Sequence, residues 1–267
     1  WRGTGTDRPC SGACGRGIEA SNAAHLPLGA VEVPSGLSGM TGAVMGSAVC
    51  AHLTVTFVGR KQGFYLGAGP DHVGEIRFHD LGIPFDAIAH IEPALERFGA
   101  ADLAALLPPR RATDHKGRFG HVLIVGGNVG MAGAARLAGE AALRSGAGLV
   151  SVAVRPEAVA VVGAGRPELM VRGVGCPADL EPLLARASVI ALGPGLGQDD
   201  WARELLQRVL GAGQPKGLDA DALNLLAAVP ARRADWVLTP HPGEAAGVPG
   251  WPAAGTQAAR PGAAQAT

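Results

Sequence analysis

Hydrophobic residues in this chain fall into short runs that are separated by glycine-rich turns and by segments with helical spacing. The clearest example begins with the apolar run His121–Val125 and continues through glycines at 126, 127, 130 and 133. A helical pattern follows from about Ala132 to Gly146, and Leu149–Val154 is a second apolar run. This order predicts a strand, a glycine-rich loop, a helix and a parallel strand.

The same alternation recurs on both sides of this unit. Further strands are expected at Leu28–Val33, His52–Val58, Glu75–Asp80, Ala187–Leu192 and Trp236–Thr239, and a weak one just before Asp219. Helices are expected at Gly12–Ala24 and Asp199–Leu210, and a glycine-rich loop at Lys61–Gly74. Strands that alternate with helices indicate an α/β fold with parallel sheets.

A boundary between two domains is expected near the middle of the chain. Pro93–Leu107 has helical spacing, and the pair Pro108–Pro109 then disfavours any continuation. We therefore expect a first domain over 1–92, a linker over 93–112 and a second domain over 113–267.

Composition narrows the class of protein. The 267 residues are 47% hydrophobic and 17% charged, with no net charge, which favours a buried core and gives no basic patch for nucleic acid. No apolar run reaches the ~18 residues of a membrane span. Four scattered cysteines form no zinc-type spacing, and no P-loop or GxGxxG motif occurs. We expect a cytoplasmic protein that binds neither membranes nor nucleic acids.

Four loops are expected to meet at one edge of the second sheet. The loops GGNVGMAG, GPGLG, LDADALN and TPHPGE each follow an apolar strand and precede a helix. The carboxyl ends of parallel strands lie at one edge, where open α/β sheets bind ligands. Glycines also occur in such loops simply because tight turns need positive φ, so any single loop leaves both interpretations open.

Individual polar residues in these loops also have two interpretations. Asp219 and Asp221 are suited to a ribose, a metal or a hydroxyl, yet Asp is also an ordinary helix cap, which we favour for Asp221. His241, fixed between two prolines, suits either a ligand contact or an exposed loop. Glu244 is expected to cap a helix rather than to face a ligand. In the first domain, Glu32 is either a base or a turn residue.

Several motifs of this sequence resemble those of a known protein family. The segment from Lys116 to Glu244, with HKGRFGHVLIVGGNVGMAG, RPELMV, ALGPGLG, LDADALNLL and LTPHPGE, is similar to the dehydratase domain of NAD(P)H-hydrate repair enzymes. Residues 3–84, with GTGTDRP, VEVPSGLSGMTG, LTVTFVGRKQGFYLGAG and DLGIP, resemble the later half of the epimerase domain of bifunctional members.

The resemblance implies a fold and an activity. It implies a partial Rossmann-like epimerase domain followed by an incomplete ribokinase-like three-layer α/β/α domain. It implies ADP- or ATP-dependent dehydration of the S hydrate of NAD(P)H, with Mg²⁺, and interconversion of the R and S hydrates with K⁺. A homo-oligomer is compatible with this. A ribokinase-like small-molecule kinase and a non-catalytic nucleotide-binding module are the alternatives.

The resemblance also implies site residues. Ala134, Gly195 and His241 match hydrate-binding positions, and Gly127, Gly130, Asp219, Asp221 and Glu244 lie in the same motifs. In the epimerase-like part, Gly3, Thr4, Gly5, Thr6, Asp7, Arg8 and Pro9 match a substrate loop. Glu32 matches a substrate-binding carboxylate, tentatively catalytic, and Ser35 matches a potassium position.

The sequence departs from the family pattern in several places. Glu32 stands where the family has Asp, and the segment Gly247–Gly250 replaces a usual helix. Motifs like GNNGGDG, KGAGT and GTGDVLAG do not occur in the 267 residues. The last of these carries the Asp that the resemblance implies as the dehydratase base, and we expect it to lie beyond Thr267. We therefore expect an internal fragment of a bifunctional enzyme with weak activity of its own.

Overall fold

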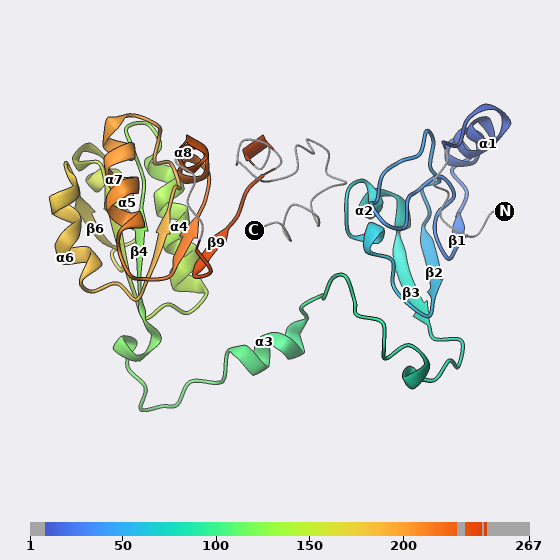
Figure 1. Cartoon of the computed structure of the whole chain (residues 1–267), viewed down its shortest axis with the longest axis horizontal. Coiled ribbons are helices and arrows are strands. Elements are labelled where there is room, and N and C mark those ends of the chain that lie inside the picture. Colours follow the sequence, from blue (N-terminus) through green and yellow to red (C-terminus); the bar gives the residue numbers. More distant parts are fainter. Residues whose placement is uncertain (1–8, 229–232, 242, 245–267) are drawn as a thin grey trace. The chain divides into compact units, whose positions relative to one another are not determined.

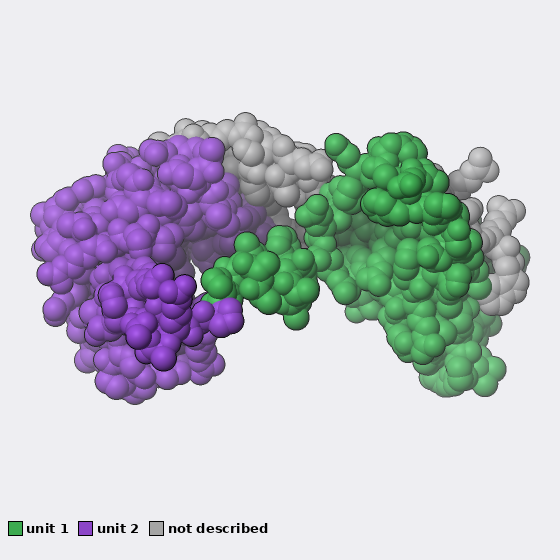
Figure 2. Space-filling model, turned by 90° about the horizontal axis from the view of Figure 1, so that it is seen from below, with its two compact units in different colours: residues 1–108, 256–265 green, residues 109–255, 266–267 purple. Residues whose placement is uncertain are grey.

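The computed structural model describes residues 9–228, 233–241 and 243–244. These residues divide into two compact units, one that extends to Pro108 and one that begins at Pro109. Figure 1 traces the elements along the chain, and Figure 2 shows the two units in different colours. Each unit is built around its own parallel sheet.

The first unit contains a three-stranded parallel sheet in the order β1-β2-β3. Leu37 and Phe64 are almost fully buried in its core, together with Val33, Ala48 and Val73. The strands are β1 (Gly29–Val31), β2 (Leu53–Phe57) and β3 (Glu75–His79), and the helices are α1 (Gly12–Ala23), η1 (Gln62–Phe64), α2 (Gly69–Val73), η2 (Phe85–Ala87) and α3 (Ala100–Leu106).

Two elements of this unit differ from the expectation. The strand predicted at Leu28–Val33 is shorter, because Glu32 adopts a φ of +71° that turns the chain out of the sheet. The helix predicted at Pro93–Leu107 was wrong over its first half. It begins only at Ala100, since Gly99 is the N-cap and its N–H donates to the Asp102 carboxylate over 2.7 Å.

The second unit contains a six-stranded sheet in the order β6-β5-β4-β7-β8-β9, with every neighbouring pair parallel. Its strands are β4 (His121–Val125), β5 (Leu149–Val154), β6 (Met170–Gly173), β7 (Val189–Leu192), β8 (Lys216–Leu218) and β9 (Trp236–Leu238). Its helices are η3 (Lys116–Phe119), α4 (Ala132–Arg144), η4 (Pro156–Ala158), α5 (Val159–Gly163), η5 (Pro177–Leu180), α6 (Glu181–Leu184), α7 (Asp200–Leu210) and α8 (Asp221–Ala228).

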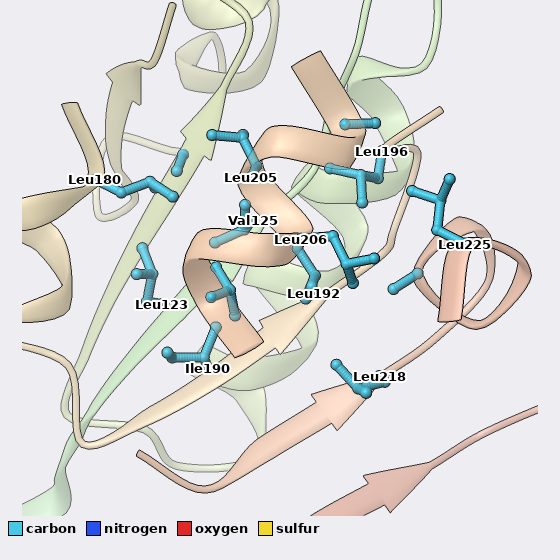
Figure 3. Close-up of a cluster of buried hydrophobic side chains, with 14 of the residues drawn as sticks. Leu123, Val125, Leu180, Ile190, Leu192, Leu196, Leu205, Leu206, Leu218 and Leu225 are labelled. Carbon is cyan, nitrogen blue, oxygen red and sulfur yellow. The ribbon is translucent and has the colours of Figure 1, made fainter. Parts of the chain in front are cut away.

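Helices cover both faces of this sheet. Along β4, Leu123 and Val125 pack into one hydrophobic cluster and Ile124 into another, because successive side chains of a strand point to opposite faces. The first cluster also contains Leu205 of α7 and Leu223 of α8, and Figure 3 shows part of it. The second contains Ala135 of α4 and Val162 of α5. The predicted three-layer α/β/α class is therefore confirmed.

The second unit also shows what the hydrophobic pattern missed. Met170–Gly173 is the edge strand β6, although only two of its residues are large and apolar and all four are at least partly exposed. Within the described residues, no helix is long and apolar enough to cross a membrane.

Candidate functional site

Two glycine-rich loops lie against each other at the carboxyl ends of the neighbouring strands β4 and β7. The Gly127 N–H donates to the Pro194 carbonyl over 3.0 Å, and the Asn128 N–H donates to the Gly195 carbonyl over 2.7 Å. A Cβ on Gly126 would overlap the Pro194 carbonyl oxygen. These glycines therefore allow two backbones to approach more closely than side chains would permit.

The predicted site residues Ala134 and Gly195 are brought together by this contact. Gly195 has a φ of +61°, and a methyl group on it would lie 3.2 Å from Ala134 Cβ and overlap the Met131 carbonyl. Gly127 has a φ of +64°, and a Cβ there would lie 2.8 Å from a Val154 methyl. Gly130, with a φ of +78°, faces open space. At position 130, glycine is therefore favoured by the backbone conformation alone.

The two aspartates of LDADALN connect the next loops. The Asp221 carboxylate accepts from the Gly197 N–H over 2.8 Å, and Asp221 is the first residue of α8 rather than the residue before it. The predicted capping role of Asp221 is thus replaced by a loop-to-loop bond. Asp219 accepts from the Thr239 hydroxyl over 2.9 Å, which ties the ends of β8 and β9.

His241 and Glu244 are joined by reciprocal hydrogen bonds. The His241 Nδ1 atom accepts from the N–H groups of Gly243 (2.9 Å) and Glu244 (3.2 Å), so the ring proton resides on Nε2. The buried Glu244 carboxylate accepts from the His241 N–H over 2.9 Å. A helix that Glu244 could cap would lie largely outside the described residues, so its capping role stays a prediction. The His241 side chain remains 67% exposed.

A polar network that sequence reasoning missed joins three elements at the same edge. Arg155, directly after β5, donates from Nε to Asn128 Oδ1 (3.2 Å) and from a terminal nitrogen to Asp199 Oδ2 (2.8 Å). Burial raises the pKa of Asp199, but hydrogen bonds from Ala202, Asn128 and Arg155 outweigh it and lower the pKa overall. The sequence feature that could have indicated this network was the position of Arg155 at the carboxyl end of a predicted strand.

In the first unit, Glu32 lines a pocket of about 930 Å³. Its carboxylate accepts from the Phe57 N–H over 2.9 Å and forms an ion pair with Lys61, which also lines the pocket. Ser35 lies three residues further along, and its carbonyl accepts from the Val49 N–H over 2.9 Å. The structure therefore places Glu32, but not Ser35, at the pocket wall.

Part of the predicted substrate loop cannot be placed. The described residues include Pro9, which is exposed, but they do not include Gly3, Thr4, Gly5, Thr6, Asp7 or Arg8. Within the described part of the chain, no group of three or more His, Cys, Asp or Glu side chains is arranged to hold a metal ion.

Two departures from the family pattern also fall outside the described residues. One is the segment Gly247–Gly250, where the family has a helix. The other is the end of the chain at Thr267, beyond which the dehydratase base is expected. The position of that base stays a prediction.

Two family models match this chain. Residues 122–266 match the family model described as NAD(P)H-hydrate dehydratase, and residues 2–63 match the one described as YjeF-related protein N-terminus. The first match covers more than half of the chain and includes all four loops. The chain thus belongs to the NAD(P)H-hydrate dehydratase family.

The curated relatives are bifunctional enzymes. The chain is 50% identical over 231 residues to the bifunctional NAD(P)H-hydrate repair enzyme Nnr of Coxiella burnetii. The aligned region covers 85% of this chain and 47% of that protein. Its identity to the Escherichia coli enzyme of the same name is 45% over 229 residues, covering 86% and 44%. The chain therefore spans about half the length of the curated relatives it matches.

Among solved structures, one similar protein is the ADP/ATP-dependent NAD(P)H-hydrate dehydratase of Bacillus subtilis, co-crystallised with ATP and Mg²⁺. It is 33% identical to this chain, with a TM-score of 0.48, and the match covers 57% of this chain and 55% of that one.

Proposed function

We propose that the carboxyl edge of the second sheet binds NAD(P)H hydrate and contributes to its ADP- or ATP-dependent dehydration. The observation that carries this proposal is the proximity of Ala134, in the first turn of α4, to Gly195, in the loop after β7. Both residues are at hydrate-binding positions of the family motifs. A close-packed backbone surface of this kind lets the hydrated nicotinamide ring approach the main chain closely, because glycine leaves no side chain in between.

His241 is the polar contributor to this site. Its Nδ1 atom already accepts from the Gly243 N–H. The Nε2 atom, 3.2 Å from a Glu244 oxygen, is therefore the ring nitrogen that would donate to the hydrate. In the proposed reaction the nucleotide supplies a phosphoryl group, which converts the hydrate hydroxyl into a leaving group. In the elimination that follows, phosphate leaves with the electron pair of its C–O bond, a base takes a proton from the neighbouring ring carbon, and the electrons of that C–H bond form the double bond. The residues of this edge bind and orient the hydrate, and positioning dominates such a step.

The nucleotide and Mg²⁺ fit this edge only in part. The amino-terminal end of α4, a helix of 13 residues with no side-chain cap at Met131, presents N–H groups on the same side as the glycine loops. Carboxylates near the edge, such as Asp219 and Asp221, are each bonded to a neighbouring loop. Mg²⁺ is typically held by one or two carboxylates and by the phosphates, so these two aspartates are the available protein ligands.

For the first unit we propose a role in the epimerase half. Pro9 and Glu32 are the described residues at substrate positions of the family motifs, and Ser35 is the position proposed for K⁺, which prefers oxygen ligands such as hydroxyls and carbonyls. Residues 1–92 and 113–267 are proposed as the two catalytic halves with a linker over 93–112, in a cytoplasmic protein.

The test is equilibrium binding of NADPH hydrate to the chain, with His241→Ala and Gly195→Ala as site variants. Binding by the wild-type chain that both substitutions weaken at least tenfold supports the proposal. Binding of unchanged strength in both variants places the hydrate elsewhere, and no binding at millimolar hydrate rejects the site.

A further inference from the structure

The network around Asn128 joins three segments that are far apart in the sequence. The Asn128 Nδ2 group donates to the Leu196 carbonyl (3.0 Å) and to Asp199 Oδ2 (3.2 Å), while its Oδ1 atom accepts from Arg155 and from the Val129 N–H (2.8 Å). Asn128 is 6% exposed. Every donor and acceptor of this buried amide is therefore used, and such a network holds one arrangement of its members.

Arg155 comes from a third segment, directly after β5, and its side chain bonds to residues of both loops. Its guanidinium bonds Asn128 of the first glycine loop and Asp199 at the end of the second, and it lies 4.6 Å from the Trp201 ring centroid. Trp201 is itself fixed, because its indole N–H donates to the Val174 carbonyl over 2.9 Å. The planar guanidinium is thus held on its edge by two acceptors and on its face by an aromatic ring.

The second loop needs a glycine beside Asn128. Gly197 has a φ of +76°, and a Cβ on it would lie 2.7 Å from Asn128 Nδ2. The same Gly197 donates its N–H to Asp221. The loops of β4, β7 and β8 therefore share one hydrogen-bonded chain, and Arg155 attaches it to the end of β5.

We propose that Arg155 is a positioning residue for the hydrate edge, and that Asn128, Arg155 and Asp199 act as a clamp that holds the loop before α4 and the loop of Gly195 in register. Without Arg155, the Asn128 and Asp199 side chains lose their common partner and the two loops separate more readily. This proposal rests on the function proposed above, since the register of the loops matters only if they bind the hydrate.

Four variants distinguish the loss of the clamp from a general loss of stability. Arg155→Ala removes both bonds, whereas Arg155→Lys keeps a charge beside Asp199 but loses the forked geometry. Asp199→Asn keeps the helix cap, because an amide oxygen still accepts from the Ala202 N–H (3.0 Å), and loses the charge pair. Arg203→Ala is the matched control, since it removes an exposed ion pair with Asp200 from the same helix.

Hydrogen exchange of the intact chain is the first readout, and it needs no ligand. Amides in 126–131 and 194–199 should exchange roughly tenfold faster in Arg155→Ala, less so in Arg155→Lys, while β4 and the control variant stay at the wild-type rate. Exchange in both loops that equals the wild-type rate overturns the clamp. So does an increase spread evenly over the loops and the core strands.

The rise in unfolding midpoint caused by NADPH hydrate is the second readout. A positioning role predicts that Arg155→Ala loses most of this rise, whereas a purely structural role lowers the midpoint equally with and without hydrate. A full rise in Arg155→Ala overturns the positioning role. If the wild-type chain shows no rise, the proposed function fails and the positioning role fails with it, and the exchange data then decide the clamp alone.

Discussion

The backbone N–H of Asn128 donates to the carbonyl oxygen of Gly195 across 2.7 Å, joining two loops that are 67 residues apart in the sequence. The bond places Ala134 beside Gly195 and turns two separate glycine motifs into one surface. The glycines at this junction have little freedom to vary, because a Cβ on Gly126, Gly193 or Gly195 would overlap a backbone oxygen.

Gly195→Ala should destabilise the second unit strongly. The new methyl group would overlap the Met131 carbonyl at a φ of +61°, so the free energy of unfolding should fall by at least about 2 kcal/mol. Gly213→Ala is the control, because Gly213 has open space around it and no positive φ, and it should change stability by less than about 1 kcal/mol. Chemical denaturation measures both, and equal effects would refute the role of close approach.

Asp221→Ala should lower the free energy of unfolding more than Asp200→Ala does, although each residue is the first of its helix. Both substitutions lose the favourable interaction of a carboxylate with the helix dipole, about 0.3–1 kcal/mol. Only Asp221→Ala also leaves the Gly197 N–H without its acceptor, which should add about 1–3 kcal/mol. The difference in unfolding free energy between the two variants tests the bond directly, and no difference would contradict it.

Lys61→Met should destabilise the first unit by about 1–3 kcal/mol. Lys61 forms an ion pair with Glu32 and donates to the carbonyls of Phe57 (3.1 Å) and Gly59 (2.8 Å), and its side chain is 25% exposed. These bonds fix the turn in which Val58, a β-branched residue, has a φ of +61°.

The control for Lys61 is Arg77→Met on β3. Arg77 pairs with Glu75 over 2.9 Å, but both side chains are more than 60% exposed, so this substitution should change stability by less than about 1 kcal/mol. Denaturation followed by a probe in the first unit compares the two. Similar losses would show that the Lys61 contacts are no more stabilising than an exposed pair.

Protonation of His121 should lower the stability of the second unit below neutral pH. Burial, and then the nearby Arg186, lower the pKa of His121 below its usual 6.5. The unfolded chain therefore takes up the proton first as the pH falls through 6.5, and stability is lost between that value and the folded-state pKa. The pH dependence of unfolding should weaken in His121→Gln and, to a smaller extent, in Arg186→Gln. Identical curves for all three proteins would rule out this linkage.

The parts of the fold that could be predicted are those encoded locally. The β-branched run His121–Val125 and the glycines after it identify a strand and a tight loop. The helix expected over Asp199–Leu210 is present as α7, with Asp199 as its N-cap. Convergence of the four loops followed from the geometry of parallel strands, and hydrogen bonds between successive loops confirm it.

The parts that could not be predicted depend on contacts between distant residues. Nothing near Asn128 in the sequence indicates that its amide bonds Arg155, 27 residues away, or Asp199, 71 residues away. Likewise, Asp221 suits a helix cap by residue type, and only the folded loops show that its carboxylate accepts from Gly197 instead. The roles of Ala134, Gly195, His241 and Glu32 toward a substrate remain proposals.

Hydrogen exchange of the chain with and without NADPH hydrate and ADP tests the central claim most directly. If the carboxyl edge of the second sheet binds the hydrate, its backbone amides lose access to solvent or open less often. The account predicts protection in 126–134 and 193–197 and at His241, with little change at the opposite ends of the same strands. Saturating hydrate that leaves these loops unprotected, or that protects another part of the chain instead, would contradict it.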